Sequence, residues 1–442
     1  MFQFIKLVQP VWYFNLPPGH DHGYFPAPEV LRKQMPFMKP DPSFSTGAAD
    51  MELSYRAFRL GCINTDSKPG INWWLGQKTE LEDEYRFIRK YFHFSRVLFA
   101  LFYRIITLNN PLKEIKAFHR SKKIKRFNHR EVYNEHNEYI EFKSKLLSEA
   151  PQVTVIIPTL NRYEYLKDVL ADLTKQDYPN FNVIVVDQST PYRAEFYAGF
   201  KLDMKVIHQA EKALWRARNT AIRNTDADYL LFYDDDSRIE TDWISQHIKC
   251  IDYFKSDISS GVSISKVGAS VPENYRYFRW SDQLDTGNVM IHRSVFHKTG
   301  LFDRQFEGQR MGDGEFGLRS YLQGFRNVSN PKAQRLHLKV GGGGLREMGS
   351  WDAFRPKSIF APRPVPSVLY LYRKYHGTRA ACNAIALNLP PSVIPYKFKN
   401  NRKLLVLGSF LTIFLLPFII IQVGRSWRIA SRMLKKSGIE YL

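Results

Sequence analysis

The chain has 442 residues, of which 44% are hydrophobic and 14% aromatic, and its formal net charge is +21. This length exceeds one compact domain, and the apolar content is ample for a folded core. Three widely separated cysteines argue against a disulfide framework and a zinc cluster, and they fit a reducing compartment.

The positive charge is concentrated in two clusters, one before the central part of the chain and one around an apolar segment near the C-terminus. Both clusters lie beside apolar stretches, and no recognised nucleic-acid module occurs. An anionic membrane surface is therefore favoured over nucleic acid as the partner. The first cluster comprises Lys116, Arg120, Lys122, Lys123, Lys125, Arg126 and Arg130.

Residues 1–150 show the weakest pattern of secondary structure in the chain. Residues 1–70 are rich in Pro, Phe and Gly, which predicts an irregular arm that packs on another part of the molecule. Residues 1–10 have too short an apolar stretch for a secretory signal. The pattern becomes helical over residues 79–147, and the apolar run at 97–103 predicts either a core helix or a helix in the membrane interface.

At residue 151 the pattern changes to that of a parallel α/β sheet. Continuous apolar or β-branched runs predict buried strands, and apolar residues at helical spacing predict the helices between them. This alternation predicts a doubly wound sheet with right-handed crossovers, whose ligands bind beyond the carboxyl ends of the strands. The strands are expected at 153–157, 181–186, 204–208 and 229–233, and the helices at 163–176 and 213–224.

Three consecutive aspartates, Asp234, Asp235 and Asp236, follow the last of these strands. Adjacent carboxylates repel one another, so a fold that gathers them usually supplies a cation. At the carboxyl end of a strand they could hold Mg²⁺ or Mn²⁺ against a diphosphate, since hard oxygen ligands suit these ions. A solvated acidic turn is the alternative. Asp187, which ends the second strand, is expected on the same rim.

Four consecutive glycines at residues 341–344 are unsuited to stable helix or strand. They predict a flexible loop, which is either a gate over the site or a plain linker. Between the aspartates and this loop, the pattern predicts helices at 241–254, 293–299 and 313–323 and strands at 288–292 and 333–338.

An uncharged segment at residues 404–424 is about long enough to cross a bilayer. A simple span usually has its positive excess on one side only, whereas basic residues flank this segment on both sides. Together with Pro417, they favour a broken or re-entrant element over a single span or a buried soluble helix. The cations are Lys397, Lys399, Arg402 and Lys403 before it, and Arg425, Arg428, Arg432, Lys435 and Lys436 after it.

A series of motifs in the central part resembles the family 2 glycosyltransferases, which have the GT-A fold. Their order and spacing carry the resemblance. It covers roughly residues 151–345 and implies a GT-A domain with a doubly wound mixed sheet there. Outside it, the sequence pattern predicts an irregular and helical region at 1–150 and a helical region at 346–442 with a membrane segment at about 404–424. Besides the aspartates, the motifs are VIIPTLNR at 155–162, VVDQS at 185–189, ARN at 217–219, GNVM at 287–290, GLFD at 300–303 and GDGEFGLR at 312–319.

The resemblance implies a nucleoside-diphosphate sugar as donor, most often a uridine diphosphate sugar, and a divalent Mn or Mg ion as cofactor. Asp234 and Asp236 match the metal-binding positions of the DxD motif, and Asp235 is expected near the ribose. His337 matches a histidine that completes the metal shell in some GT-A enzymes; a structural strand histidine is the alternative. The positions expected to bind the nucleotide or its phosphates are Pro158, Thr159, Asn161, Arg162, Asp187 and Arg218.

Asp313 matches the catalytic base of the family, which most members carry as Glu-Asp, whereas this chain has Gly312 before it. In an inverting transfer the carboxylate deprotonates the acceptor hydroxyl that attacks the anomeric carbon. A helix cap is the alternative role for Asp313, and Glu315 is the alternative base. The acceptor is expected on the side of Gly287 and Asn288.

The sequence therefore predicts an inverting, metal-dependent glycosyltransferase of surface polysaccharide synthesis. We expect it at the cytoplasmic face of the cell membrane, peripheral or single-pass, acting on a glycan or lipid-linked acceptor and binding no nucleic acid. A nucleotidyltransferase of the same fold is disfavoured, because residues 158–162 contain no glycine for a triphosphate loop. A non-catalytic membrane-bound scaffold is supported by Gly312 and opposed by the three aspartates.

Overall fold

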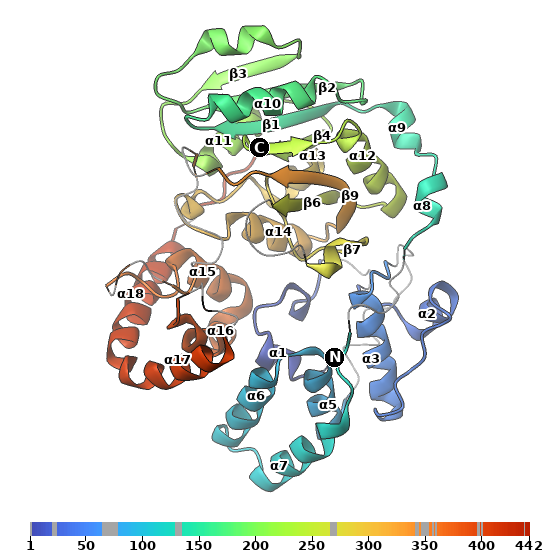
Figure 1. Cartoon of the computed structure of the whole chain (residues 1–442), viewed down its shortest axis with the longest axis vertical. Coiled ribbons are helices and arrows are strands. Elements are labelled where there is room, and N and C mark those ends of the chain that lie inside the picture. Colours follow the sequence, from blue (N-terminus) through green and yellow to red (C-terminus); the bar gives the residue numbers. More distant parts are fainter. Residues whose placement is uncertain are drawn as a thin grey trace.

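The computed structural model describes residues 2–19, 24–63, 78–128, 135–265, 272–340, 344–345, 353–355, 358, 360–395, 398, 401–436 and 438–442. A central sheet with its covering helices occupies one end of the long axis, and the helices of the N- and C-terminal regions lie toward the other end (Figure 1). The predictions for Arg130, Lys397, Lys399 and the first three glycines of 341–344 lie outside the described residues.

The described part of the chain forms a nine-stranded mixed sheet in the order β3-β2-β1-β4-β8-β6-β9-β5, with β7 paired to β9 outside this path. β3, β2, β1 and β4 are parallel, whereas β8 is antiparallel to both β4 and β6. The expected mixed α/β sheet is confirmed. The strands are β1 (Val153–Thr159), β2 (Phe181–Asp187), β3 (Met204–His208), β4 (Tyr229–Tyr233), β5 (Ser237–Ile239), β6 (Ile258–Ser265), β7 (Arg279–Trp280), β8 (Asn288–His292) and β9 (Asn327–His337).

Helices cover both faces of the sheet, and alternate residues of each strand enter two different cores. Val155 of β1 packs in a core with side chains of α10 and α12, whereas its neighbour Ile156 packs in a core with side chains of α11, α13 and α14. The parallel strands β1, β2 and β4 are mainly apolar, as predicted for strands covered on both faces. These helices are α10 (Tyr163–Leu173), α11 (Leu214–Arg223), α12 (Trp243–Phe254), α13 (Arg293–Thr299) and α14 (Gly312–Leu322), with 3₁₀ turns η3 (Ala194–Gly199), η4 (Glu273–Tyr275) and η5 (Arg304–Phe306) between elements.

The register of the parallel strands places their carboxyl ends on one rim. Thr159, the last residue of β1, lies opposite Asp187, and Asp187 lies opposite His208 at the end of β3. The strand β4 ends at Tyr233, directly before the aspartates. Asp187 and the aspartate triplet therefore extend from the same edge of the sheet, as expected.

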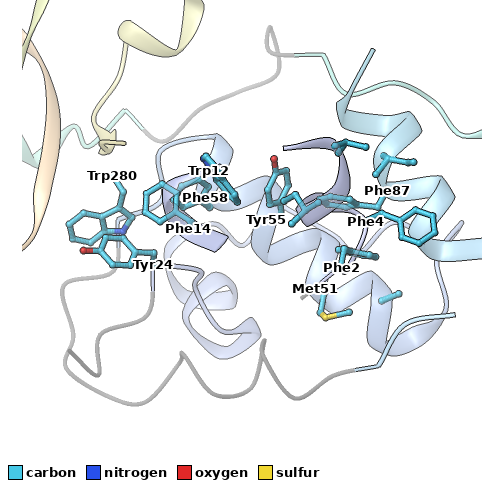
Figure 2. Close-up of a cluster of buried hydrophobic side chains, with 14 of the residues drawn as sticks. Phe2, Phe4, Trp12, Phe14, Tyr24, Met51, Tyr55, Phe58, Phe87 and Trp280 are labelled. Carbon is cyan, nitrogen blue, oxygen red and sulfur yellow. The ribbon is translucent and has the colours of Figure 1, made fainter. Parts of the chain in front are cut away.

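The N-terminal region folds around an aromatic core, and Figure 2 shows its side chains. Trp280 of β7 joins this core, since its ring lies 5.0 Å from that of Tyr24, so the region packs directly on the sheet. The expected packing on another part is correct, but the expected irregular arm is wrong. Helix α3 is 14 residues long and was missed because its buried face includes the polar side chains of Glu52 and Ser54.

The elements of the N-terminal region are short helices. The run at 97–103 lies within α6, whose inner side packs in the aromatic core. The elements are α1 (Ile5–Val8), η1 (Tyr13–Asn15), α2 (Pro28–Gln34), α3 (Thr46–Arg59), α5 (Leu81–Tyr91), α6 (Phe94–Ile106), α7 (Pro111–Arg120), η2 (Ser121–Lys123), α8 (Glu138–Glu141) and α9 (Lys145–Glu149).

The C-terminal region contains a bent pair of helices. No helix within the described residues is by itself long and apolar enough to cross a bilayer, but α17 and α18 together satisfy both criteria and are bent by 84°. The break lies at Leu415, two residues before Pro417, which the sequence predicts to interrupt the apolar run. The elements are α15 (Pro366–Leu371), the π-helical turn η6 (Tyr372–His376), α16 (Gly377–Ser392), α17 (Arg402–Phe414) and α18 (Leu416–Leu434).

Candidate active site

The three aspartates after β4 have separate partners. Asp234 accepts a hydrogen bond of 2.7 Å from Arg335 and one of 3.4 Å from Arg218. Arg335 is 1% exposed and also donates to Asp285, at 2.9 Å, so this buried guanidinium lies between two carboxylates. Side chains of the protein therefore supply part of the positive charge that the acidic triplet requires.

Asp235 faces the loop that follows β1. Its carboxylate accepts hydrogen bonds from the Thr159 hydroxyl, at 2.7 Å, and from Arg162, at 3.0 Å. Burial raises the pKa of Asp235 to about 6, although Arg162 and Thr159 both favour the charged form. In this arrangement Asp235 holds the residues of the predicted nucleotide loop in place.

Asp236 and His337 form the part of the rim that could hold a metal ion. Oδ1 of Asp236 lies 3.2 Å from Nε2 of His337, and its other carboxylate oxygen lies 3.4 Å from Arg162. Burial alone would raise the pKa of Asp236, but the hydrogen bond from His337 and the charge of Arg162 lower it below its ordinary value. The carboxylate is therefore available in its charged form.

The three predicted metal ligands lie together. One ligand atom each from Asp234, Asp236 and His337 falls within a group whose members are at most 4.8 Å apart. Two carboxylates and an imidazole are donors that Mn²⁺ accepts, and carboxylates also suit Mg²⁺. The residues present therefore fit a divalent cation.

Asp187 is fully buried, and its carboxylate is surrounded by donors. The hydroxyls of Tyr163 and Tyr197 donate to one oxygen, at 2.7 and 2.8 Å, and the backbone N–H of Ser189 donates to the other, at 2.8 Å. Burial and the Asp187 carboxylate raise the pKa of Tyr197, so this phenol remains a donor. As it lies here, Asp187 positions the turn after β2, and a ligand would have to displace a tyrosine to reach it.

Gln188 follows Asp187 in the sequence and is 1% exposed. Its side-chain carbonyl accepts hydrogen bonds from the backbone N–H of Ala213, at 2.6 Å, and from Gln209, at 3.1 Å. These bonds fix the orientation of the amide, because a backbone N–H can only donate. Gln188 thus joins the end of β2 to the start of α11.

The loop after β1 is held by the predicted nucleotide-binding residues themselves. Pro158 is buried in β1 and Thr159 ends the strand. Asn161 has φ +54°, its backbone N–H donates to Ser189 at 2.7 Å, and its side chain accepts from the N–H of Thr190. Arg162 then points back toward the aspartates.

Gly344, the described member of the glycine run, lies against Arg162. Its N–H donates to the carbonyl of Leu160 at 2.9 Å, and a Cβ at this position would lie 2.5 Å from Nη2 of Arg162. With φ +84°, this backbone also requires the conformational freedom of glycine. The end of the glycine run is therefore beside the rim, on the side of the nucleotide loop.

Asp313 lies in the first turn of α14, half-buried, and accepts a hydrogen bond of 2.8 Å from the N–H of Gly314. The preceding Gly312 is packed against the indole of Trp215. Arg218 lies over the same indole, with Cζ 5.0 Å from the ring centroid, and it also donates to Asp234. A continuous series of contacts thus joins the helix of Asp313 to the acidic triplet.

Glu315 is not available as a base. It is fully buried, pairs with Arg319 at 3.0 Å and Lys374 at 3.3 Å, and accepts a short hydrogen bond from Tyr375. Burial alone would raise the pKa of Glu315, but Arg319 and Lys374 lower it. The alternative base therefore stabilises the junction of α14 with the C-terminal helices.

Asn288, expected on the acceptor side, is fully buried. Its carbonyl oxygen accepts from Trp243 and His247, and its amide donates to the carbonyls of Val262 and Ala333. All four of its hydrogen-bonding positions are thus in use, so Asn288 as it lies here supports the site from behind and does not face an acceptor.

Gly287, its neighbour, is beside the rim. A Cβ at Gly287 would lie 2.5 Å from Cζ of Arg335 and would also overlap Asp234. Only a residue without a side chain leaves room for Asp234 and Arg335 to form their ion pair. Gly287 therefore contributes to the site by allowing this pair to form.

Sequence reasoning missed three side chains that organise the rim: Arg335, Tyr163 and Tyr197. Arg335 carried a usable signal, because it lies two residues before His337 on β9 and therefore on the same face of the strand. Tyr163 and Tyr197 carried no comparable signal, since a tyrosine at such a position is expected simply to pack with its apolar neighbours.

Comparison with known proteins identifies the central part of the chain. Residues 154–313 match the family model described as Glycosyl transferase family 2. The glycosyltransferase GlyA of Streptococcus pneumoniae is 28% identical over 167 residues, which are 36% of this chain and 22% of that protein. The poly(ribitol-phosphate) beta-N-acetylglucosaminyltransferase TarS of Staphylococcus aureus is 31% identical over 112 residues, 24% of this chain and 20% of TarS. The matches thus span about a fifth of the length of these two relatives.

A crystal structure of residues 1–349 of the S. aureus TarS protein in complex with UDP-GlcNAc is also similar. It has 18% sequence identity and a TM-score of 0.45, and the match covers 64% of this chain and 82% of that one.

Proposed function

Because this chain belongs to glycosyltransferase family 2 through residues 154–313, we propose that it transfers a sugar from a nucleoside-diphosphate sugar to a glycan or lipid-linked acceptor. The observation that carries this proposal is the gathering of Asp234, Asp236 and His337 at the carboxyl rim of the sheet. Arg218 connects this group to the helix of Asp313 through Trp215. In open α/β sheets this rim is where ligands bind.

Donor binding would use the cations of the rim. Arg162 and Arg218 both lie beside the aspartates, and guanidinium groups bind phosphate oxygens through paired N–H donors. The loop of Pro158, Thr159 and Asn161 would contact the nucleotide, and Asp235 holds that loop through Thr159. A uridine diphosphate sugar is the donor we expect, as the resemblance of the motifs to the family implies.

A divalent cation held by Asp234, Asp236 and His337 would supply charge stabilisation for the leaving diphosphate. These three residues would bind the cation. Arg335 keeps the carboxylate of Asp234 in position through a hydrogen bond of 2.7 Å. Asp313 would accept the proton of the acceptor hydroxyl as it attacks the anomeric carbon. Such an attack inverts the configuration at that carbon, and general-base assistance contributes about 10²–10⁴-fold in rate.

We also propose attachment to the cytoplasmic face of the cell membrane through α17 and α18, in a re-entrant arrangement. The support is the position of the chain beyond them. The backbone N–H of Leu301 donates to the carbonyl of Glu440 at 2.7 Å, and Arg223 pairs with the Glu440 side chain at 2.5 Å. The chain thus returns to the central domain after α18, which supports an arrangement with both ends of the bent pair on one side of the membrane. A lipid-linked acceptor in surface polysaccharide synthesis suits this location.

The test of the activity is direct. The purified full chain, in detergent, is incubated with a panel of nucleoside-diphosphate sugars, and release of the nucleoside diphosphate is measured with Mn²⁺ and with a chelator. Turnover of one donor that depends on Mn²⁺ is the expected result. Absence of both binding and turnover across the whole panel would refute the proposal. Protection of a C-terminal tag from protease in sealed vesicles, with the central domain exposed, would refute the re-entrant arrangement.

A further inference from the structure

Helices α6 and α7 and the turn between them expose a group of large apolar side chains, here called the α6–α7 surface. Their exposed fractions range from 42% for Ile115 to 95% for Leu108. The inner sides of both helices pack in the aromatic core, so the outer residues are not needed to fold the hairpin. Soluble surfaces rarely present such contiguous apolar groups without a partner. The surface consists of Phe94, Phe102, Ile106, Leu108, Leu112 and Ile115.

The tip of the hairpin is formed by the residue that is most exposed. Leu108 has φ +62°, in the left-handed region, which is unfavourable for a leucine and gains nothing in water. In this conformation the apolar side chain of Leu108 is 95% exposed to solvent. This is the geometry of a residue that inserts into an apolar environment.

A second apolar surface lies at the same end of the molecule, on α17 and α18, here called the α17–α18 surface. Figure 1 shows α6, α7 and α17 toward the end of the long axis opposite to β3. Helix α16 lies between the two surfaces, and its Arg379 donates to the Tyr103 hydroxyl of α6 at 3.4 Å. The exposed residues of this second surface are Val406, Leu407, Phe410, Leu411, Ile413, Phe414, Leu415, Leu416, Phe418, Ile420 and Ile421.

The two segments that carry these surfaces are almost entirely positive in charge. Residues 94–126 contain nine lysines and arginines and one carboxylate, Glu114, which is buried and pairs with Arg104 at 2.7 Å. Residues 401–436 contain seven lysines and arginines and no carboxylate. Between the surfaces, Lys6, Arg104 and Arg379 line a cavity of about 440 Å³ in which none of the described lining residues is acidic. Cations that border an apolar surface complement an anionic lipid headgroup layer.

We propose that the α6–α7 surface is a second membrane contact, which inserts into an anionic bilayer beside the α17–α18 surface. Two contacts at one end of the molecule would fix its orientation on the bilayer. A second copy of the chain is a poorer occupant, because an interface between two copies would bring two strongly positive surfaces together. The proposal does not depend on glycosyl transfer.

The test compares three variants of the full chain in binding to vesicles of phosphatidylcholine, with and without phosphatidylglycerol. The first replaces Ile106, Leu108 and Leu112 with serine, and the second replaces Phe410, Phe414 and Phe418 with serine. The control replaces Phe37 and Ile140, which are 57% and 67% exposed and lie outside both surfaces. We expect the first variant to lose roughly tenfold or more of its affinity for the anionic vesicles, and the control to lose none. Donor turnover in detergent is measured for all variants and stays normal in the first.

Insertion itself is followed in a chain that carries Cys382→Ser, which removes the exposed thiol. An environment-sensitive fluorophore is attached through Leu108→Cys, or through Ile140→Cys as the control. A blue shift on anionic vesicles at position 108, absent at position 140, is expected. Unchanged fluorescence at position 108 while the protein binds would overturn the proposal, since the α17–α18 surface would then bind alone. A shift at 108 that follows protein concentration in the absence of lipid would also overturn it and indicate self-association. Failure of donor turnover in the wild-type chain would refute the proposed function and leave this result unaffected.

Discussion

The indole of Trp215 fills the space that a side chain at Gly312 would need. A Cβ at Gly312 would lie 2.5 Å from Cε2 of Trp215, whereas real Cβ atoms do not approach other atoms within about 3 Å. Trp215 is itself fixed, because its Nε1 donates to the carbonyl of Phe306 at 3.1 Å. At Gly312, where the family usually has a glutamate, the space for a side chain is therefore filled by the indole of Trp215. The same ring lies under Arg218.

Changing Gly312 to alanine should destabilise the protein, since the ring cannot move aside without losing its hydrogen bond. Overpacking of this kind costs about 1–3 kcal/mol, measurable as a lower midpoint of urea unfolding. Gly314→Ala in the same helix is the matched control, because a Cβ there meets only the end of Met311, at 3.4 Å. Equal losses in the two variants would contradict the role given to Trp215.

Changing Asp313 to asparagine should abolish transfer and leave donor binding and stability nearly unchanged. The reason is that the half-buried Asp313 is proposed to remove a proton, and an amide cannot accept one. We expect turnover to fall by roughly 10²–10⁴-fold, measured by release of nucleoside diphosphate. Glu315→Gln is the comparison: it removes the negative charge that Arg319 and Lys374 share, so its main effect should be lower stability. Normal turnover by Asp313→Asn would remove this residue from the chemistry.

Replacing Arg335 with methionine should destabilise the protein, because Asp234 and Asp285 would lose the guanidinium between them. Removal of one partner from a buried ion pair costs about 3–5 kcal/mol. We expect added Mn²⁺ to restore part of the loss, since a cation at Asp234 replaces some of the missing charge. Urea unfolding with and without Mn²⁺ measures both effects. Lys145→Met removes an exposed pair with Glu149 and should cost less than about 1 kcal/mol.

Mn²⁺ should raise the melting temperature of the wild-type protein, because a ligand that binds only the folded state stabilises it. At a concentration 100 times the dissociation constant, the gain is about 2.7 kcal/mol. Asp236→Asn and His337→Ala should each weaken this shift, measured by differential scanning fluorimetry. His297→Ala, a change on the exposed side of α13, should not. A full shift in both rim variants would show that Mn²⁺ binds elsewhere on the protein.

The buried His247 should make the protein less stable in acid. Burial lowers the pKa of His247 from 6.5 to about 4. Asn288 offers His247 only an oxygen acceptor, so Nε2 carries the proton, and Nδ1 of the neutral ring accepts from Ser259. Between pH 6.5 and about 4 the unfolded chain binds a proton here that the folded chain does not. Stability therefore decreases as the pH falls through this range, by about 3 kcal/mol in total.

The measurement is the free energy of urea unfolding at neutral pH and near pH 4, for the wild type and for His247→Gln. The variant should lose less stability on acidification than the wild type, whatever other groups contribute. His93→Gln, at an exposed position, serves as the control. An equal pH dependence in the wild type and His247→Gln would show that the folded protein protonates this histidine freely.

The sequence by itself determined the type and the order of most central elements. Residues 153–157 could be read as a buried strand because they form a continuous β-branched run, which suits a sheet covered on both sides, and the strand extends to Thr159. The strand β6 was not predicted, because ISSGVSIS lacks the apolar content of its neighbours and is buried by pairing with β8 and β9. In the same way, the polar side chains on the inner face of α3 concealed a helix.

The sequence also determined which carboxylates meet, since parallel strands end on one rim and the aspartates follow one of these strands directly. Only the tertiary structure decided what each carboxylate does there. Asp187 is enclosed by two tyrosines, Asp234 is bound by Arg335, and Glu315 is neutralised within a buried network. The physical reason is that a carboxylate's role depends on the donors and the burial around it, and decisive donors such as Tyr163, Arg335 and Lys374 come from other elements of the fold.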